Sequence, residues 1–253
     1  MAVNSGPNIE KDGLVFYIDP ANKDSFAPSA STTEANSLIT DKLITGSATS
    51  TGAYDNVNQG IFDFDGISTR IIFEAMNTSS IFDYNEEYNF SIWIKQDDWG
   101  DTNGSQVHFG SGGYYNGASS RGMEFSQYNS PSTLSVQVRT NAANYYLAAV
   151  DNAGFVNNSG NFDWAYFSCN KINTGGNNSK LELYVNGVFN GEKTDVLDAA
   201  NYNFNNNVFG LGGRADGNSS YASRAKIGPI KIYNRTLSSK EIETNFHATN
   251  RFI

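Results

Sequence analysis

The sequence has little of the chemistry that disulfide bonding, metal binding or membrane insertion needs. Cys169 is the only cysteine, so no disulfide can form within the chain. The pattern around it is that of a strand, and we expect a buried, unreactive thiol. The two histidines, His108 and His247, lie far apart in the sequence, and no run approaches the roughly 18 apolar residues of a membrane-spanning helix.

Positive charge is also scarce, because 17 Lys and Arg residues face 26 Asp and Glu residues and give a formal net charge of −9. Phosphate backbones and anionic lipid surfaces repel such a chain, so we expect neither nucleic-acid binding nor membrane insertion. Residues 1–13 contain no apolar stretch of the kind found in signal peptides. We therefore expect the protein to be made in a cytoplasm.

Alternation of apolar and polar residues is the dominant pattern in the sequence. It is clear in 90–95, 134–139 and 181–185, and polar stretches rich in Gly, Asn, Ser and Asp separate such segments. This pattern predicts half-buried strands of a sandwich or jelly roll. The length of 253 residues is compatible with one all-β domain. Residues 25–58 are polar, and we expect a long irregular surface excursion there.

Two local motifs predict their structure directly. Asn186-Gly187 lies between two strand-like runs and favours a type I′ hairpin turn, which would pair Val185 with Val188.

Near the end of the chain, Ser238 and Glu241 have the spacing of a capping box, and Leu237 and Ile242 flank it as a hydrophobic staple. We expect a short helix there, with His247 at its surface.

The order of several segments resembles a known family. Residues 13–22, 62–66, 90–95, 183–187 and 228–238 are similar to successive strands of laminin-G-like, concanavalin A-like domains. The resemblance implies an all-β jelly-roll sandwich of two antiparallel sheets with a short C-terminal helix. We expect an N-terminal arm at 1–12 and the domain at 13–253.

Two departures from the family concern its calcium site. Ile67-Ser68-Thr69 stand where further acidic residues often follow the Phe-Asp-Gly motif, and residues 31–50 replace a segment usually rich in Asn and Gly. Asp19 and Asp65 remain as candidate calcium ligands. Two separated carboxylates do not supply the six to eight oxygens that calcium takes. We therefore expect no cofactor, and calcium is the metal to test.

The opening residues 1–15 are similar to stand-alone laminin-G-like proteins of tailed, particularly marine, phages. That resemblance implies a protein of the virion surface: a head decoration, a fibre or an adhesin. Its partners would then be capsid or tail proteins and host surface polysaccharide, and it could form a homo-oligomer.

Catalysis is not expected. Retaining glycoside hydrolases need two carboxyl groups about 5–5.5 Å apart, and the Glu-x-Asp-x-x-Glu string of related hydrolases does not occur here. The sequence has no Gly-x-Ser-x-Gly and no His-Glu-x-x-His motif either. A glycoside hydrolase is therefore the least favoured function.

Aromatic side chains in polar loops are the candidates for contact with a glycan or a partner protein. They are Trp99, Tyr114, Tyr115, Arg214 and Tyr221. Such residues also pin their own loops or pack in subunit interfaces, and sequence does not separate these roles. A virion surface module and a lectin-like carbohydrate-binding domain of a cellular protein both fit.

Overall fold

The computed structural model describes seventeen segments of the chain. They are residues 8–22, 25, 34–36, 38, 45–47, 54–55, 60–67, 69–73, 86–97, 105–111, 122–128, 134–139, 145–149, 161–176, 178–196, 209–214 and 221–250. Most of these residues lie in strands, and the short helix α2 (Ser239–Thr249) lies at the end of the described part of the chain. The predicted all-β class is confirmed.

The first of two large sheets has eight strands. They are β1 (Leu14–Ile18), β4 (Tyr54–Asp55), β5 (Ile61–Asp63), β7 (Tyr88–Gln96), β12 (Phe162–Gly175), β13 (Asn178–Val185), β14 (Val188–Val196) and β16 (Ala225–Tyr233). Their order is β14-β13-β12-β7-β16-β5-β4, with β1 also paired to β16. The order is far from the sequence order, as expected of a jelly roll.

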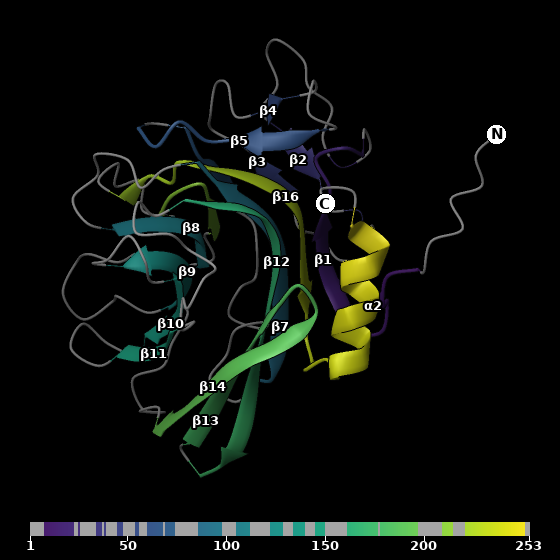
Figure 1. Ribbon diagram of the computed structural model, residues 1–253, viewed down its shortest axis with the longest axis vertical. Helices are drawn as coiled ribbons and strands as arrows, with labels where there is room; N and C mark the ends of the chain where they lie inside the picture. Colours follow the sequence, from purple (N-terminus) through teal and green to yellow (C-terminus); the bar gives the residue numbers. More distant parts are fainter. Residues whose placement is uncertain are drawn as a thin grey trace.

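The second sheet has six strands and faces the first. They are β6 (Ile71–Phe73), β8 (Ser105–Ser111), β9 (Gly122–Tyr128), β10 (Leu134–Arg139), β11 (Tyr145–Ala149) and β15 (Phe209–Leu211). Their order is β11-β10-β9-β8-β15-β6. Figure 1 shows β8 to β11 on one side of β7, β12 and β16, and helix α2 on the other side.

The main core lies between the sheets and follows the predicted alternation. On β7, Phe90, Ile92 and Ile94 point inward, and all three are fully buried. Aromatic rings join the layers, since the ring of Phe90 stacks on that of Phe109 in β8 with centroids 5.3 Å apart. Cys169 on β12 is buried in the same core as predicted, and burial raises the pKa of its thiol.

The predicted hairpin is confirmed between β13 and β14. Asn186 and Gly187 both have positive φ, 51° and 81°, as a type I′ turn requires. Val185 pairs with Val188, and the ring of Tyr184 meets that of Phe189 edge-on at 5.5 Å.

Helix α2 covers a second, aromatic core on the outer face of the eight-stranded sheet. Trp93 of β7 is fully buried there, and its ring stacks on that of Phe246 with centroids 5.6 Å apart. Its indole nitrogen donates to Thr249 Oγ1 at 2.9 Å. The capping box of Ser238 and Glu241 is present as predicted. Its flanking staple residues, Leu237 and Ile242, are both buried in this cluster.

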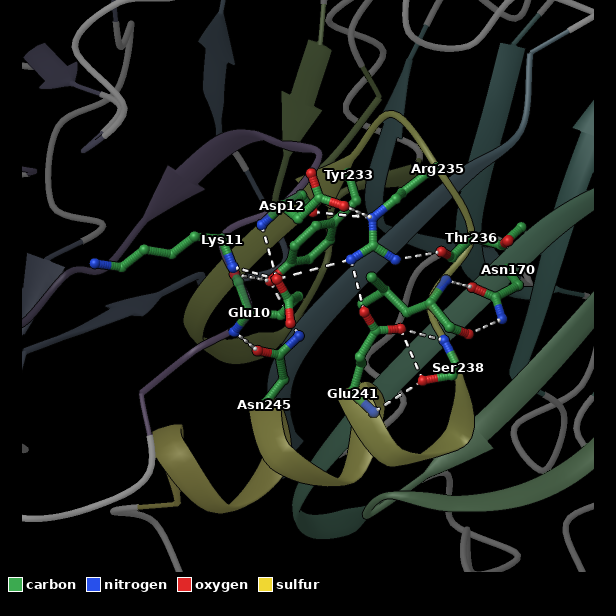
Figure 2. A network of polar contacts seen from close by, with 11 residues as sticks. Glu10, Lys11, Asp12, Asn170, Tyr233, Arg235, Thr236, Ser238, Glu241 and Asn245 are labelled. Carbon is green, nitrogen blue, oxygen red and sulfur yellow. Dashed lines mark hydrogen bonds and ion pairs between the residues drawn. The ribbon is translucent and has the colours of Figure 1, made fainter.

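A network of polar contacts joins residues 10–12 to this helix and to the segment before it (Figure 2). We call the group formed by Arg235 with Glu10, Asp12 and Glu241 the clasp. The Arg235 guanidinium donates to Glu241 Oε1 at 2.7 Å and to the Asp12 backbone oxygen at 3.1 Å. The Glu10 amide donates to Asn245 Oδ1 at 2.8 Å. The end of the predicted N-terminal arm is therefore bound to the domain.

The segment from 25 to 58 is less irregular than predicted. It contains the short pairs β2 (Glu34–Asn36) with β3 (Thr45–Ser47), and β4 extends the eight-stranded sheet by pairing with β5. The sequence did not predict these strands because their residues are polar and lack the apolar alternation that indicates a strand. They pair through their backbones alone.

Candidate binding site

A polar pocket of about 250 Å³ opens where β7 ends and β12 begins. It lies at the ends of these two strands, and ligands of such folds usually bind near strand ends. Its lining is Lys95, Gln96, Asp97, Asn161, Phe162 and Asp163. These six residues form two groups of three consecutive residues, and the pairing of two neighbouring strands brings the groups together.

An irregularity in that pairing shapes the pocket. Phe162 pairs with Gln96 and Ala165 pairs with Ile94, so β12 has an additional residue between these two positions. Such a bulge bends a strand and redirects its side chains. Asp163 is exposed here, while Trp164 packs beside the aromatic core under α2. The bulge therefore presents a carboxylate at the rim of the pocket.

Two lysines lie opposite each other on neighbouring strands beside the pocket, so two positive charges face each other. Lys95 on β7 pairs with Lys226 on β16, an arrangement that is unfavourable by itself. Two carboxylates offset it, since Lys95 Nζ lies 3.0 Å from Asp163 Oδ1 and 3.9 Å from Asp97 Oδ1. Lys226 forms an ion pair with Asp97 Oδ2. The result is an alternating row of charges, which we call the charge row.

The carboxylate of Asp163 is held in its ionised form. The Trp164 backbone N–H donates to Asp163 Oδ1 at 2.9 Å, and this bond together with the Lys95 ammonium lowers the pKa of Asp163 below its ordinary value. The side chain is 84% exposed. Its other oxygen, Oδ2, accepts no hydrogen bond from the residues that the structure describes.

Gln96 lines the pocket but is only 1% exposed, and its side chain lies between the two sheets, on the same face of β7 as Ile94. Its Nε2 donates to Gln127 Oε1 on β9 of the other sheet, which fixes the orientation of the amide. Its Oε1 is buried and has no hydrogen-bond partner within the described part of the chain. A buried acceptor without a partner costs about 1–3 kcal/mol, so such atoms in native proteins commonly have a functional explanation.

Most of the aromatic residues that the sequence analysis proposed as ligand contacts lie outside the described segments. Trp99, Tyr114 and Tyr115 all do. The stretch that contains Trp99 follows Asp97, a lining residue of the pocket. The structure thus describes the start of the polar loop in which Trp99 was predicted to contact a ligand.

Arg214 and Tyr221 are described and lie together. The Arg214 guanidinium carbon is 4.5 Å from the centre of the Tyr221 ring, within the range of a cation–π contact. Arg214 is only 2% exposed. This burial makes it a poor surface contact, while Tyr221 is partly exposed. Their role in ligand binding stays a prediction.

Asp19 and Asp65, the candidate calcium ligands, each organise a turn. Asp65 Oδ1 accepts hydrogen bonds from the backbone N–H groups of Ile67 and Thr69 and from Thr69 Oγ1. Asp19 Oδ1 accepts from the Ala21 N–H at 3.0 Å. Among the described residues, no group of three or more His, Cys, Asp or Glu side chains is close enough to hold a metal ion.

One buried pair has a nucleophile beside a histidine. His108 Nδ1 lies 2.7 Å from Ser223 Oγ, and both residues are fully buried. Burial lowers the pKa of His108 to about 3, so the ring is neutral. A fully buried hydroxyl is inaccessible to substrate, and we assign this pair to packing. His247 is exposed, as predicted.

The comparisons with known proteins identify the family. A laminin-G family model described as the concanavalin A-like lectin/glucanases superfamily matches residues 73–243, about two thirds of the sequence. This chain belongs to that family. The predicted family and jelly-roll fold are therefore confirmed. A search of curated protein sequences finds no significant match.

Solved structures with a similar fold include binding domains of botulinum neurotoxins. The binding domain of botulinum neurotoxin serotype D/C has a TM-score of 0.63 at 12% identity, covering 94% of this chain and 53% of its own. A botulinum neurotoxin DC binding domain in complex with SialylT has a TM-score of 0.64 at 11% identity, covering 95% and 52%.

The binding domain of Paraclostridial Mosquitocidal Protein 1 has a TM-score of 0.63 at 15% identity, covering 92% and 52%. This chain thus spans about half the length of these structures, and at such low identities the similarity shows the fold alone. No helix in the described segments is long and apolar enough to cross a membrane.

Proposed function

We propose that this chain is a non-catalytic carbohydrate-binding module of a tailed-phage virion surface, and that the pocket between β7 and β12 is its glycan site. The observation that supports glycan binding most directly is the chemistry of the pocket. Protein sites for sugars use planar polar groups with fixed orientations, and Asp163, whose Oδ1 is held by Lys95 and the Trp164 N–H, supplies one of them. The toxin domains with the same fold are also binding domains.

The absence of catalysis is part of this proposal. Asp97 and Asp163 are the two carboxylates of the pocket, and both form ion pairs with lysine. A glycosidase acid must be protonated at working pH, which requires a raised pKa. The pKa of Asp163 is lowered instead. We expect no release of reducing ends from laminarin, agar, alginate or bacterial exopolysaccharide, and turnover abolished by Asp163→Asn would contradict the proposal.

Glycan binding is tested with the purified protein on a glycan array. Asp163→Asn removes the exposed charge of the pocket, and we expect binding to fall by about tenfold or more with an unchanged melting temperature. Glu243→Gln is the matched control, because Glu243 is also an exposed carboxylate with a lysine partner, but lies on α2. No binding to any glycan would refute this function.

The virion location rests on the similarity of residues 1–15 to stand-alone phage proteins. In this proposal the module docks on capsid or tail proteins and contacts host polysaccharide. Immunogold labelling with an antibody against the chain should decorate intact particles of the phage that encodes it. Labelling of a cell envelope, with none on particles, would favour the alternative of a cellular lectin-like domain.

A further inference from the structure

Two Asn-Gly steps lie close together at the hairpin of β13 and β14, and their surroundings differ. Asn186-Gly187 forms the turn, and Asn190-Gly191 lies on β14. Asparagine is a chemically labile residue. Glycine has no side chain, so its backbone nitrogen can approach the carboxamide of the asparagine before it. This approach begins the loss of the amide group, so each step is a candidate site of spontaneous modification.

Hydrogen bonds and packing restrain Asn186-Gly187. Asn186 Oδ1 accepts a hydrogen bond from the Tyr166 N–H at 2.9 Å, and the Asn186 N–H donates to the Tyr166 carbonyl at 2.8 Å. Gly187 lies against α2, since a side chain at this position would meet Glu243 Cα and Phe246 Cδ1, each at 3.4 Å. A movement that brings the carboxamide of Asn186 onto the next peptide nitrogen must therefore break these bonds and shift the turn against the helix.

Asn190-Gly191 lacks these restraints. The register of β14 on β13 passes from Phe189 to Gly191, so Asn190 is the additional residue of a bulge. Asn190 is exposed, and its carboxamide forms no hydrogen bond with the residues that the structure describes. Among the described residues beyond its two chain neighbours, no atom lies within 4 Å of the position that a Gly191 side chain would take.

The place of β14 in the sheet also favours reaction there. It comes first in the strand order and, among the described strands, pairs with β13 alone. Local opening of an edge strand breaks backbone hydrogen bonds on one side only, so it costs less free energy than opening of a packed element. Opening at Asn190 therefore costs less than opening at Asn186, which the contacts with Tyr166 and α2 oppose.

We propose that Asn190 is a site of spontaneous deamidation and that the fold protects Asn186. The Gly191 nitrogen bonds to Asn190 Cγ, and the bond from Cγ to Nδ2 breaks. The proton of the Gly191 nitrogen goes to the departing Nδ2, which leaves as ammonia, and a succinimide ring remains. Water then opens the ring at either carbonyl and gives aspartate or isoaspartate. Both products place a new negative charge next to Glu192 on the edge strand.

The test incubates the folded protein at mildly alkaline pH and follows both residues by peptide mapping with fragmentation mass spectrometry. We expect deamidation at Asn190 about tenfold or more faster than at Asn186, because its opening costs less. In urea, where the fold is lost, the two rates should become similar. Gly191→Ala should slow the reaction at Asn190 strongly, because a Cβ hinders the attacking nitrogen. The open space around Gly191 and its lack of a positive φ allow the alanine.

The two residues serve as controls for each other within the wild-type chain, so the test stays valid if the Gly191→Ala variant unfolds. Equal rates at Asn190 and Asn186 in the folded protein, or a faster rate at Asn186, would overturn the inference. It would also be overturned if Asn190 reacted only in urea, or if a folded Gly191→Ala variant lost its Asn190 amide as fast as the wild type.

Discussion

The clasp and the charge row are two clusters of opposite charges at opposite ends of strand β16, and they differ in where their carboxylates lie. Their cations are equally exposed, with 29% of the Arg235 side chain and 31% of the Lys95 side chain accessible. In the clasp, Glu241 is 26% exposed and binds Arg235 and the backbone of Ser238. In the charge row both carboxylates are at least half exposed, Asp97 at 51% and Asp163 at 84%, while in the clasp only Asp12 is, at 83%.

The partly buried carboxylates of the clasp, Glu10 and Glu241, accept hydrogen bonds from backbone N–H groups and from Arg235, so they stabilise the attachment of α2. The carboxylates of the charge row pair with lysines at a more exposed position. We infer that burial of the carboxylates, and not the presence of a lysine or arginine, distinguishes the cluster that holds the fold from the one that is open to a partner.

The largest loss of stability is expected beside the clasp, at Asn170. Its buried amide donates to the Leu237 carbonyl at 2.8 Å and accepts from the Leu237 N–H at 3.0 Å, and it also accepts from Asn89. Asn170→Ala should lower the free energy of unfolding by about 3 kcal/mol, because buried backbone groups lose their partners. Urea denaturation measures this. Asn178→Ala, at an exposed position of β13, is the control and should change little.

A smaller, pH-dependent loss is expected in the clasp itself. Hydrogen bonding to Arg235 lowers the pKa of Glu241 from an ordinary value near 4.5 to about 2. The resulting stability is present above pH 4.5 and is lost as the pH falls towards 2, since the unfolded chain takes up its proton first. Glu241→Gln should cost on the order of 2 kcal/mol at pH 7 and much less near pH 2.5. An equal cost at both pH values would contradict the assignment.

Trp99→Ala should change binding far more than stability. A tryptophan in an Asp- and Gly-rich loop is typical of a contact residue, and such aromatics dominate binding energy. We expect a nearly unchanged melting temperature and a strong fall in attachment to glycan or to virions. A lower melting temperature, corresponding to a loss of about 3 kcal/mol in the free energy of unfolding, together with normal attachment would show that Trp99 packs its own loop.

The smallest effect is expected on removal of metal. Asp19 and Asp65 have their carboxylates bound to backbone N–H groups, as in the clasp. A chelator should therefore leave the melting temperature unchanged. A calcium site filled at a hundredfold over its dissociation constant would add about 2.7 kcal/mol, and a drop of several degrees in a thermal scan would reveal it.

Local signals predicted the fold well because they depend on neighbouring residues. The Asn186-Gly187 turn requires only two positive φ angles, and the capping box requires only Ser238 and Glu241. The alternation in 90–95 placed Phe90, Ile92 and Ile94 in the core. Each of these signals is complete within a few residues.

The pocket could not be predicted in this way. Lys95 and Asp163 are far apart in the sequence, and each has the appearance of a solvated residue at a strand end. Their meeting depends on the pairing of β7 with β12 and on the bulge beside Phe162. The burial of Lys231 was equally hidden, because the outer face of its strand becomes internal only when α2 and its neighbours cover it.

The clasp has a mechanical consequence. Strands β1 and β16 are antiparallel, with Leu14 opposite Tyr233 at the end where the chain enters β1 and leaves β16. A pulling force between residues 8 and 250 would open this pair from that end, one hydrogen bond after another. The bonds of Glu10 to Asn245 and of Asp12 to Arg235 bridge the same end and carry the load first. Under tension, these bonds therefore resist the separation of β1 from β16.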